Sequence, residues 1–139
     1  MKIFLFLLAI LISSPSFAQT APTISVMDFV KVKNDKWPEV LYYYENNWKL
    51  YRDIALKRNF IVSYRLLKAK PDSVSTFDLV LITEYADSLQ FKMAEERFQI
   101  IIKEMRPTGP ILLNNFKAND FRQNMFVRET QTLFSSDKK

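Results

Sequence analysis

Residues 23–33 read TISVMDFVKVK, and this stretch decides how the rest of the chain is interpreted. If its side chains alternate, the apolar residues of even number share one face with Asp28, and they are Ile24, Val26, Val30 and Val32. A period of two that is rich in β-branched residues is typical of a strand. The sequence therefore predicts a first strand at residues 23–33, with the carboxylate of Asp28 interrupting an apolar face.

The period changes to that of a helix over residues 36–58. Large side chains recur there in steps of three and four and form one stripe, which consists of Trp37, Leu41, Tyr44, Trp48, Tyr51 and Ala55. Pro38 suits the first turn of a helix, and Asp35 is a candidate cap. We expect the stripe to pack on a sheet. The alternative is that its aromatic residues form the wall of a ligand cavity, which makes Tyr44 and Trp48 candidate ligand-binding residues.

The remaining elements complete a βαββαβ order. They are strands at 60–70 and 77–85, a helix that begins after Asp87 with Gln90 in a capping-box position, a short helix at 110–120, and a last strand at 123–134. Strands this close in sequence pair as a hairpin. The order predicts the α+β ferredoxin-like arrangement, a four-stranded antiparallel sheet with two main helices on one face.

The predicted strands carry apolar residues on both faces. In the stretch that contains Leu79 and Leu81, for example, Val80 and Ile82 point to the opposite side. A sheet with one solvated face should alternate between apolar and polar residues. We therefore expect the face away from the helices to be covered, and a homodimer through the sheet face is the simplest cover.

Residues 1–18 have the three parts of a secretory signal peptide. Lys2 precedes an apolar run from residue 3 to residue 12, and small residues lead to a cleavage site after Ala18. A membrane anchor is the alternative, but this run would rise about 15 Å as a helix, half of a ~30 Å hydrocarbon core. The sequence predicts export to a bacterial periplasm or the extracellular space, with no membrane span after cleavage. Residues 19–134 form a single domain, and residues 135–139 form a polar tail.

The composition excludes several classes of chemistry. The chain has 139 residues and a net charge of +5, with no His, no Cys and one Gly. No disulfide, thiolate nucleophile or Ser-His-Asp triad can form, and a glycine-rich nucleotide loop is absent. The basic residues are dispersed, so nucleic-acid binding is not expected. The sequence predicts no metal site and no cofactor.

Carboxylates on strands are the remaining candidates for chemistry. The candidate catalytic residues are Asp28, Arg65, Glu84 and Glu129. In a functional interpretation one buried carboxylate acts as a general base beside the guanidinium of Arg65. In a structural interpretation these groups form ion pairs between strands. Tyr64 and Tyr85 are candidate ligand-binding residues alongside the two from the helical stripe.

Residues 27–33, MDFVKVK, followed by an aromatic-rich helix, resemble small, secreted, uncharacterised members of the dimeric α/β-barrel superfamily. The resemblance covers roughly residues 23–134. It implies two ferredoxin-like protomers that pack sheet against sheet into a closed barrel. That superfamily includes cofactor-free monooxygenases, haem-handling enzymes, isomerases and proteins without known activity. The absence of His departs from its haem-handling branches.

Two functional hypotheses follow. The first is a non-enzymatic binding module for a small apolar ligand or an envelope partner, and it is favoured because no residue pattern specifies a reaction. It predicts that Arg65 and the strand carboxylates pair with one another and leave no sizeable cavity. The alternative is a cofactor-independent monooxygenase or isomerase. It predicts a closed pocket that contains one unpaired, desolvated carboxylate.

Overall fold

The computed structural model describes residues 22–70, 72 and 74–135. The predicted signal peptide therefore lies outside the described residues, as does the predicted tail except for Ser135. In the described part of the chain, no helix is long and apolar enough to span a membrane.

Four strands form one antiparallel sheet, as the sequence predicts. They are β1 (Ile24–Val32), β2 (Ser63–Lys68), β3 (Leu79–Tyr85) and β4 (Arg122–Gln131). The strand order is β2-β3-β1-β4, and every neighbouring pair is antiparallel. The first strand in sequence is therefore an inner strand, flanked on both sides.

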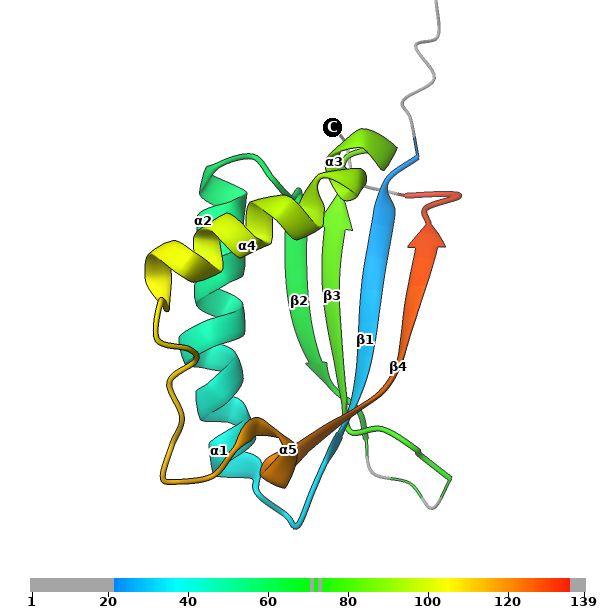
Figure 1. The fold of residues 1–139 in the computed structure, drawn as a ribbon. Helices are drawn as coiled ribbons and strands as arrows, with labels where there is room; N and C mark the ends of the chain where they lie inside the picture. The colour runs from blue at the N-terminus through cyan, green and yellow to red at the C-terminus, as the bar shows by residue number, and fades with distance from the viewer. Residues whose placement is uncertain (1–21, 71, 73, 136–139) are drawn as a thin grey trace, which may run out of the picture.

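The helices lie on one side of this sheet, which makes the protein a mixed α+β fold (Figure 1). A continuous helical stretch consists of α1 (Trp37–Tyr43), the π-helical segment η1 (Tyr44–Lys49) and α2 (Leu50–Lys57). The second half of the chain contributes α3 (Ser88–Lys92), α4 (Ala94–Met105) and α5 (Ala118–Phe121). Helix α4 crosses α2, and α5 leads directly into β4 (Figure 1).

The π-helical segment changes which side of the first helix is buried. Leu41, predicted in the buried stripe, is 48% exposed, whereas Val40 is 0% exposed. A π-helix closes its hydrogen bonds from i to i+5 and so inserts about one extra residue into a turn. The stripe therefore changes phase at η1: Tyr44, Trp48, Tyr51 and Ala55 are buried as predicted, but the residue before them in the core is Val40.

Two predictions about helix ends have different outcomes. Asp35 is not the cap of α1: Lys36 occupies that position without a side-chain cap, and Asp35 has a positive φ of 54°. Asp and Asn tolerate the left-handed region, so this residue serves the turn after β1 instead. Asp87 does cap α3, since its Oδ1 accepts a hydrogen bond from the Gln90 backbone N–H at 2.8 Å.

The predicted short helix is much shorter than residues 110–120. Only Ala118–Phe121 is helical, and a loop precedes it. A buried amide holds this loop: Asn47 donates to the Ile111 carbonyl at 2.8 Å and accepts from the Ile111 N–H at 2.9 Å. Side-chain bonds from η1 thus satisfy the backbone groups that a helix would otherwise have satisfied.

The core lies between the helices and one face of the sheet. The apolar even-numbered residues of β1 point into it, as predicted, and so does Asp28. One buried cluster comprises Val30, Val40, Tyr44, Trp48, Leu79, Leu81 and Phe121. A second comprises Tyr51, Ala55, Ile61, Tyr85, Ala94 and Ile101.

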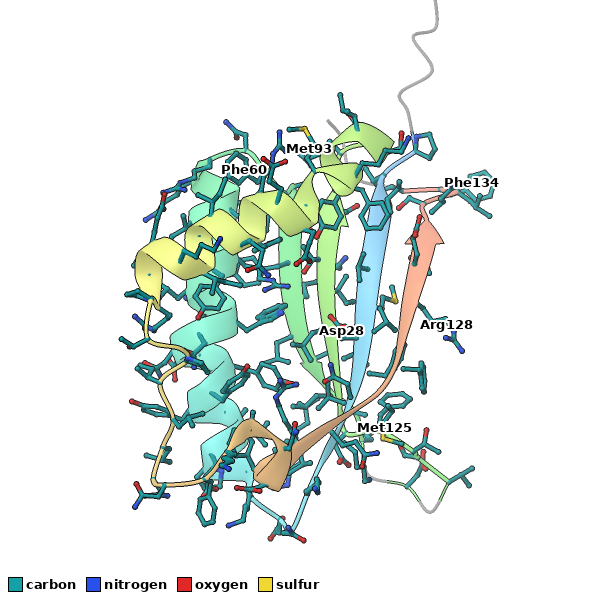
Figure 2. The ribbon with its side chains drawn as sticks, in the orientation of Figure 1. Asp28, Phe60, Met93, Met125, Arg128 and Phe134 are labelled. Atoms are coloured by element: carbon teal, nitrogen blue, oxygen red, sulfur yellow. The ribbon has the colours of Figure 1, made fainter. Side chains whose placement is uncertain are left out.

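The opposite face of the sheet is also apolar. Phe29 stacks on Phe126 with ring centroids 4.4 Å apart and meets Phe77 edge-on at 4.9 Å. In the register of the sheet, Met27, Val80 and Ile82 share this side. Figure 2 shows Met125 and Arg128 of β4 projecting away from the helices. Within the described ranges no helix covers this surface, which we call the open face (Figure 1).

Candidate ligand pocket between the helices and the sheet

A cavity of about 240 Å³ lies where Asp28 faces the helices. Its wall is aromatic and aliphatic, formed by Tyr43, Tyr44, Trp48, Tyr51, Val30, Leu81 and Ile102. Its charged and amide groups come from Asp28, Arg52, Arg122 and Asn124. We call this cavity the Asp28 pocket. Figure 2 shows Asp28 near the middle of the sheet on its helical side.

Two local irregularities of the backbone assemble the pocket. The π-helical turn contributes Tyr44 and Trp48, and such turns occur often at functional sites. A bulge shifts the register of β4 against β1, so that Phe29 pairs with Phe126 but Val30 pairs with Asn124. A one-residue shift moves the following side chains to the other face of a sheet. The bulge therefore turns Asn124 and Arg122 toward the helices.

The carboxylate of Asp28 has no partner in the described part of the chain: no hydrogen bond or ion pair of its side chain is found there. Burial raises its pKa above the ordinary value, and the positive charges of Arg52 and Arg122 partly oppose that rise. A half-buried acid with a raised pKa and two nearby guanidinium groups can accept a hydrogen bond or a proton from a molecule in the pocket.

Arg122 is held at the pocket by its neighbours. Its Nη1 donates to Asn124 Oδ1 at 2.8 Å and approaches the Tyr44 hydroxyl at 3.4 Å, while Nη2 approaches the Tyr43 hydroxyl at 3.4 Å. Its guanidinium also lies over the Tyr43 ring, 4.8 Å from the centroid. Burial raises the pKa of Tyr44 to about 12, so this hydroxyl stays protonated at neutral pH.

In the described part of the chain, two buried N–H groups of pocket residues have no hydrogen-bond partner. They are Nε1 of Trp48 and Nε of Arg122. Leaving a buried donor unsatisfied costs about 1–3 kcal/mol, and most native structures avoid it. The pocket thus combines an unpaired acceptor and two unpaired donors with an aromatic wall, which is the composition of a ligand site rather than of a closed core.

The other candidate catalytic residues do not join Asp28. Arg65 lies on β2 opposite Ile82 and points to the open face, so it cannot serve as the guanidinium beside Asp28. Glu84 accepts a hydrogen bond from the Ser63 hydroxyl at 2.8 Å on that same side. Glu129 is exposed on β4 opposite Val26. Arg65 and Glu84 thus share the open face, and Glu129 shares the face of Asp28. In the described part of the chain no ion pair joins any of these groups, so the expected pairing of Arg65 with the strand carboxylates is not found.

The four candidate ligand-binding residues do not all line the same cavity. Tyr44 and Trp48 line the Asp28 pocket, whereas Tyr85 lines a second cavity described below. Tyr64 meets Trp48 edge-on at 5.5 Å and donates a hydrogen bond to Asp53, and it lines neither cavity. Tyr64 thus packs against Trp48, which lines the Asp28 pocket, without lining the pocket itself.

Sequence reasoning missed the two arginines of the pocket. Arg52 follows Trp48 by four residues, and this helical spacing places Arg52 beside the buried aromatic stripe of the first helix. That spacing could have identified Arg52 as a candidate pocket residue. Arg122 had no comparable signal, because only the bulge in β4 turns it toward Asp28.

Comparison with solved structures finds a likeness to HapK. The crystal structure of HapK from Hahella chejuensis is similar to 84% of this chain, over 98% of the HapK chain, with 10% sequence identity and a TM-score of 0.47. At that level the likeness carries no argument about function. No family model matches the sequence, and no curated protein matches it.

Proposed function

We propose that the protein is a binding module for a small, mainly aromatic ligand, which lies in the Asp28 pocket and donates a hydrogen bond to Asp28. The observation that carries the proposal is a half-buried carboxylate in a partly open, mainly aromatic-lined cavity of about 240 Å³, with no hydrogen bond or ion pair in the described part of the chain. Flat rings match walls made of Tyr and Trp, and one polar group fixes their orientation.

The test uses 2-naphthol and its methyl ether as probes, because only 2-naphthol can donate a hydrogen bond. Calorimetry should detect tighter binding of 2-naphthol than of the ether by the unmodified protein. Asp28→Asn should weaken 2-naphthol binding about 10-fold or more, since hydrogen bonds to charged groups contribute about 1.5–3 kcal/mol. Glu129→Gln removes the same charge from an exposed position and should leave both affinities unchanged. Equal binding of the two probes would contradict the proposal.

Asp28→Asn should also change the free energy of unfolding, in a direction that depends on pH. Because the pKa of Asp28 is raised on folding, its ionisation destabilises the folded state as pH rises from the ordinary Asp value through the raised one. Asp28→Asn should therefore increase the free energy of unfolding at neutral pH, by about 0.5–2 kcal/mol. This gain should disappear below the ordinary pKa of Asp. A loss of stability at neutral pH would mean that the folded state relies on the carboxylate.

A second function is a cofactor-independent monooxygenase or isomerase that uses Asp28 as general base. The raised pKa of Asp28, together with the guanidinium of Arg122 held beside the Tyr44 hydroxyl, favours it. Incubation of 2-naphthol with the protein in air separates the two functions. Consumption that Asp28→Asn stops would support catalysis, whereas unchanged recovery supports binding alone.

We also infer that the fold is the ferredoxin-like βαββαβ arrangement and that two copies pair through their open faces into a barrel. The antiparallel order β2-β3-β1-β4 with helices on one side supports the first inference. The half-buried aromatic cluster of Phe29, Phe77 and Phe126, on a face that no helix of the described residues covers, supports the second, since monomers seldom leave large apolar patches uncovered.

Export is a further part of the proposed role, and it rests on residues 1–18. Expression of the full chain in a bacterium should give a periplasmic product whose intact mass corresponds to a start at Gln19. Ala18→Arg should block cleavage and leave the precursor in the membrane fraction. Recovery of the unmodified full-length chain from the cytosol would refute export.

A further inference from the structure

Arg52 of α2 occupies an unusual position between two aromatic rings. Its guanidinium carbon lies 4.7 Å from the ring centroid of Trp48 and 4.4 Å from that of Phe98. Its Nε donates to the Thr83 hydroxyl at 3.3 Å. These two ring contacts and one hydrogen bond restrict the position of the guanidinium group.

A second cavity, of about 580 Å³, begins on the other side of Arg52. Arg52 and Ile102 are the residues that it shares with the Asp28 pocket, so Arg52 marks the boundary between the two. The inner wall is apolar and includes Val26, Phe91 and Phe98. We call this space the Arg52 cavity.

The mouth of the Arg52 cavity is polar and nearly neutral. Its exposed residues include Lys92, Glu95 and Gln99 from α3 and α4, which carry one positive and one negative charge. The mouth therefore has little net attraction for simple inorganic anions. A ligand held here must gain most of its affinity inside, from the apolar wall and from Arg52.

In the described part of the chain, Asp28 is a carboxylate whose charge acts on Arg52, but it forms no ion pair with the terminal amino groups of Arg52. Within the described ranges, neither an ion pair nor a second hydrogen bond of this side chain is found, and its terminal nitrogens are not among the fully buried unpaired atoms. These nitrogens therefore keep some accessible surface, although the side chain is largely buried. Burial lowers the pKa of Arg52 to about 10, but the group remains cationic at neutral pH.

We propose that the Arg52 cavity binds an amphipathic monocarboxylate, with its carboxylate on the terminal amino groups of Arg52 and its apolar chain along Val26, Phe91 and Phe98. The fork of a guanidinium matches the two oxygens of a carboxylate. Because the positive charge of Arg52 also acts on Asp28, the site offers a ligand at most one positive charge, which suits a monoanion better than a phosphate dianion. This site shares Arg52 and Ile102 with the aromatic-ligand site proposed above, but its apolar wall is its own.

Calorimetry with octanoate and 1-octanol tests the proposal on the chain of residues 19–139. Octanoate should bind more tightly than 1-octanol, although the alcohol is the more apolar molecule. Arg52→Gln should weaken octanoate binding at least about 10-fold and leave 1-octanol binding nearly unchanged. Arg52→Lys keeps the charge but loses the fork, so it should restore part of the affinity.

A matched control is available in Arg97 of α4, which lies over the Phe60 ring outside both cavities. Arg97→Gln removes the same charge and should not change octanoate binding. Equal affinity of octanoate and 1-octanol for the unmodified protein would overturn the proposal, even if Arg52→Gln failed to fold. Loss of octanoate binding in Asp28→Asn but not in Arg52→Gln would overturn it too, while leaving the proposal for the Asp28 pocket intact.

Discussion

Replacing Phe121 with alanine should lower the free energy of unfolding by about 3–5 kcal/mol. Phe121 is 0% exposed and belongs to the buried cluster that contains Val30 and Trp48. Its ring also contacts that of Tyr43, with centroids 5.7 Å apart. Truncation removes the transfer free energy of the ring and leaves a cavity that the surrounding strands and helices can fill only partly. Urea unfolding followed by circular dichroism measures the change.

Because Phe121 precedes Arg122 in the chain, the loss of stability in Phe121→Ala should also affect the Asp28 pocket. Its carbonyl accepts a hydrogen bond from the Lys33 N–H at 2.8 Å, and the next residue is Arg122. We therefore expect Phe121→Ala to weaken 2-naphthol binding along with stability. Phe134 is 96% exposed, so Phe134→Ala is the matched control and should change stability by no more than about 0.5 kcal/mol. A loss below about 1 kcal/mol for Phe121→Ala would contradict tight packing beneath α5.

Introducing a charge on the open face should convert the proposed dimer into a monomer. Phe29 lies on the inner strand β1, stacked on Phe126 and edge-on to Phe77, so a sheet-to-sheet interface would centre on it. In Phe29→Arg two guanidinium groups, one from each copy, would be buried without partners. A buried unpaired charge costs several kcal/mol, which raises the dissociation constant by about 1000-fold or more.

Light scattering on residues 19–139 checks this result. The unmodified chain should give about twice the monomer mass at micromolar concentration, and Phe29→Arg should give the monomer mass. Leu133→Arg introduces the same charge at an exposed residue beyond β4 and should remain dimeric. A monomeric unmodified chain, or a Phe29→Arg variant that keeps the double mass, would refute pairing through the open face.

Much of the fold could be predicted because local patterns and tertiary packing agree. Alternation around Val26 and Val30 predicted β1 and its buried face, and Asp87 with Gln90 predicted the start of α3. The prediction of Leu41 in the core was wrong for a local reason. The π-helical turn adds one residue to the period, and no single residue type marks such a turn.

The candidate site was predicted in part. Asp28, Tyr44 and Trp48 were identified because each stands out in a periodic pattern, a lone acid on an apolar strand face and two large rings in a helical stripe. The pairing of Asp28 with Arg65 could not be judged from the sequence, since neighbouring residues of paired strands alternate between faces. The register places Leu66, not Arg65, on the side of Asp28.

The sequence by itself determined the order of the elements, the apolar character of both sheet faces and the absence of thiol and imidazole chemistry. Only the tertiary structure decided which arginines reach Asp28. A bulge in β4 turns Arg122 to the helical side, and packing between Trp48 and Phe98 holds Arg52 at the boundary of two cavities. The physical reason is that hydrophobic periodicity is a local property, which neighbouring residues in the sequence show directly. A one-residue register shift between strands depends instead on contacts between segments far apart in the chain.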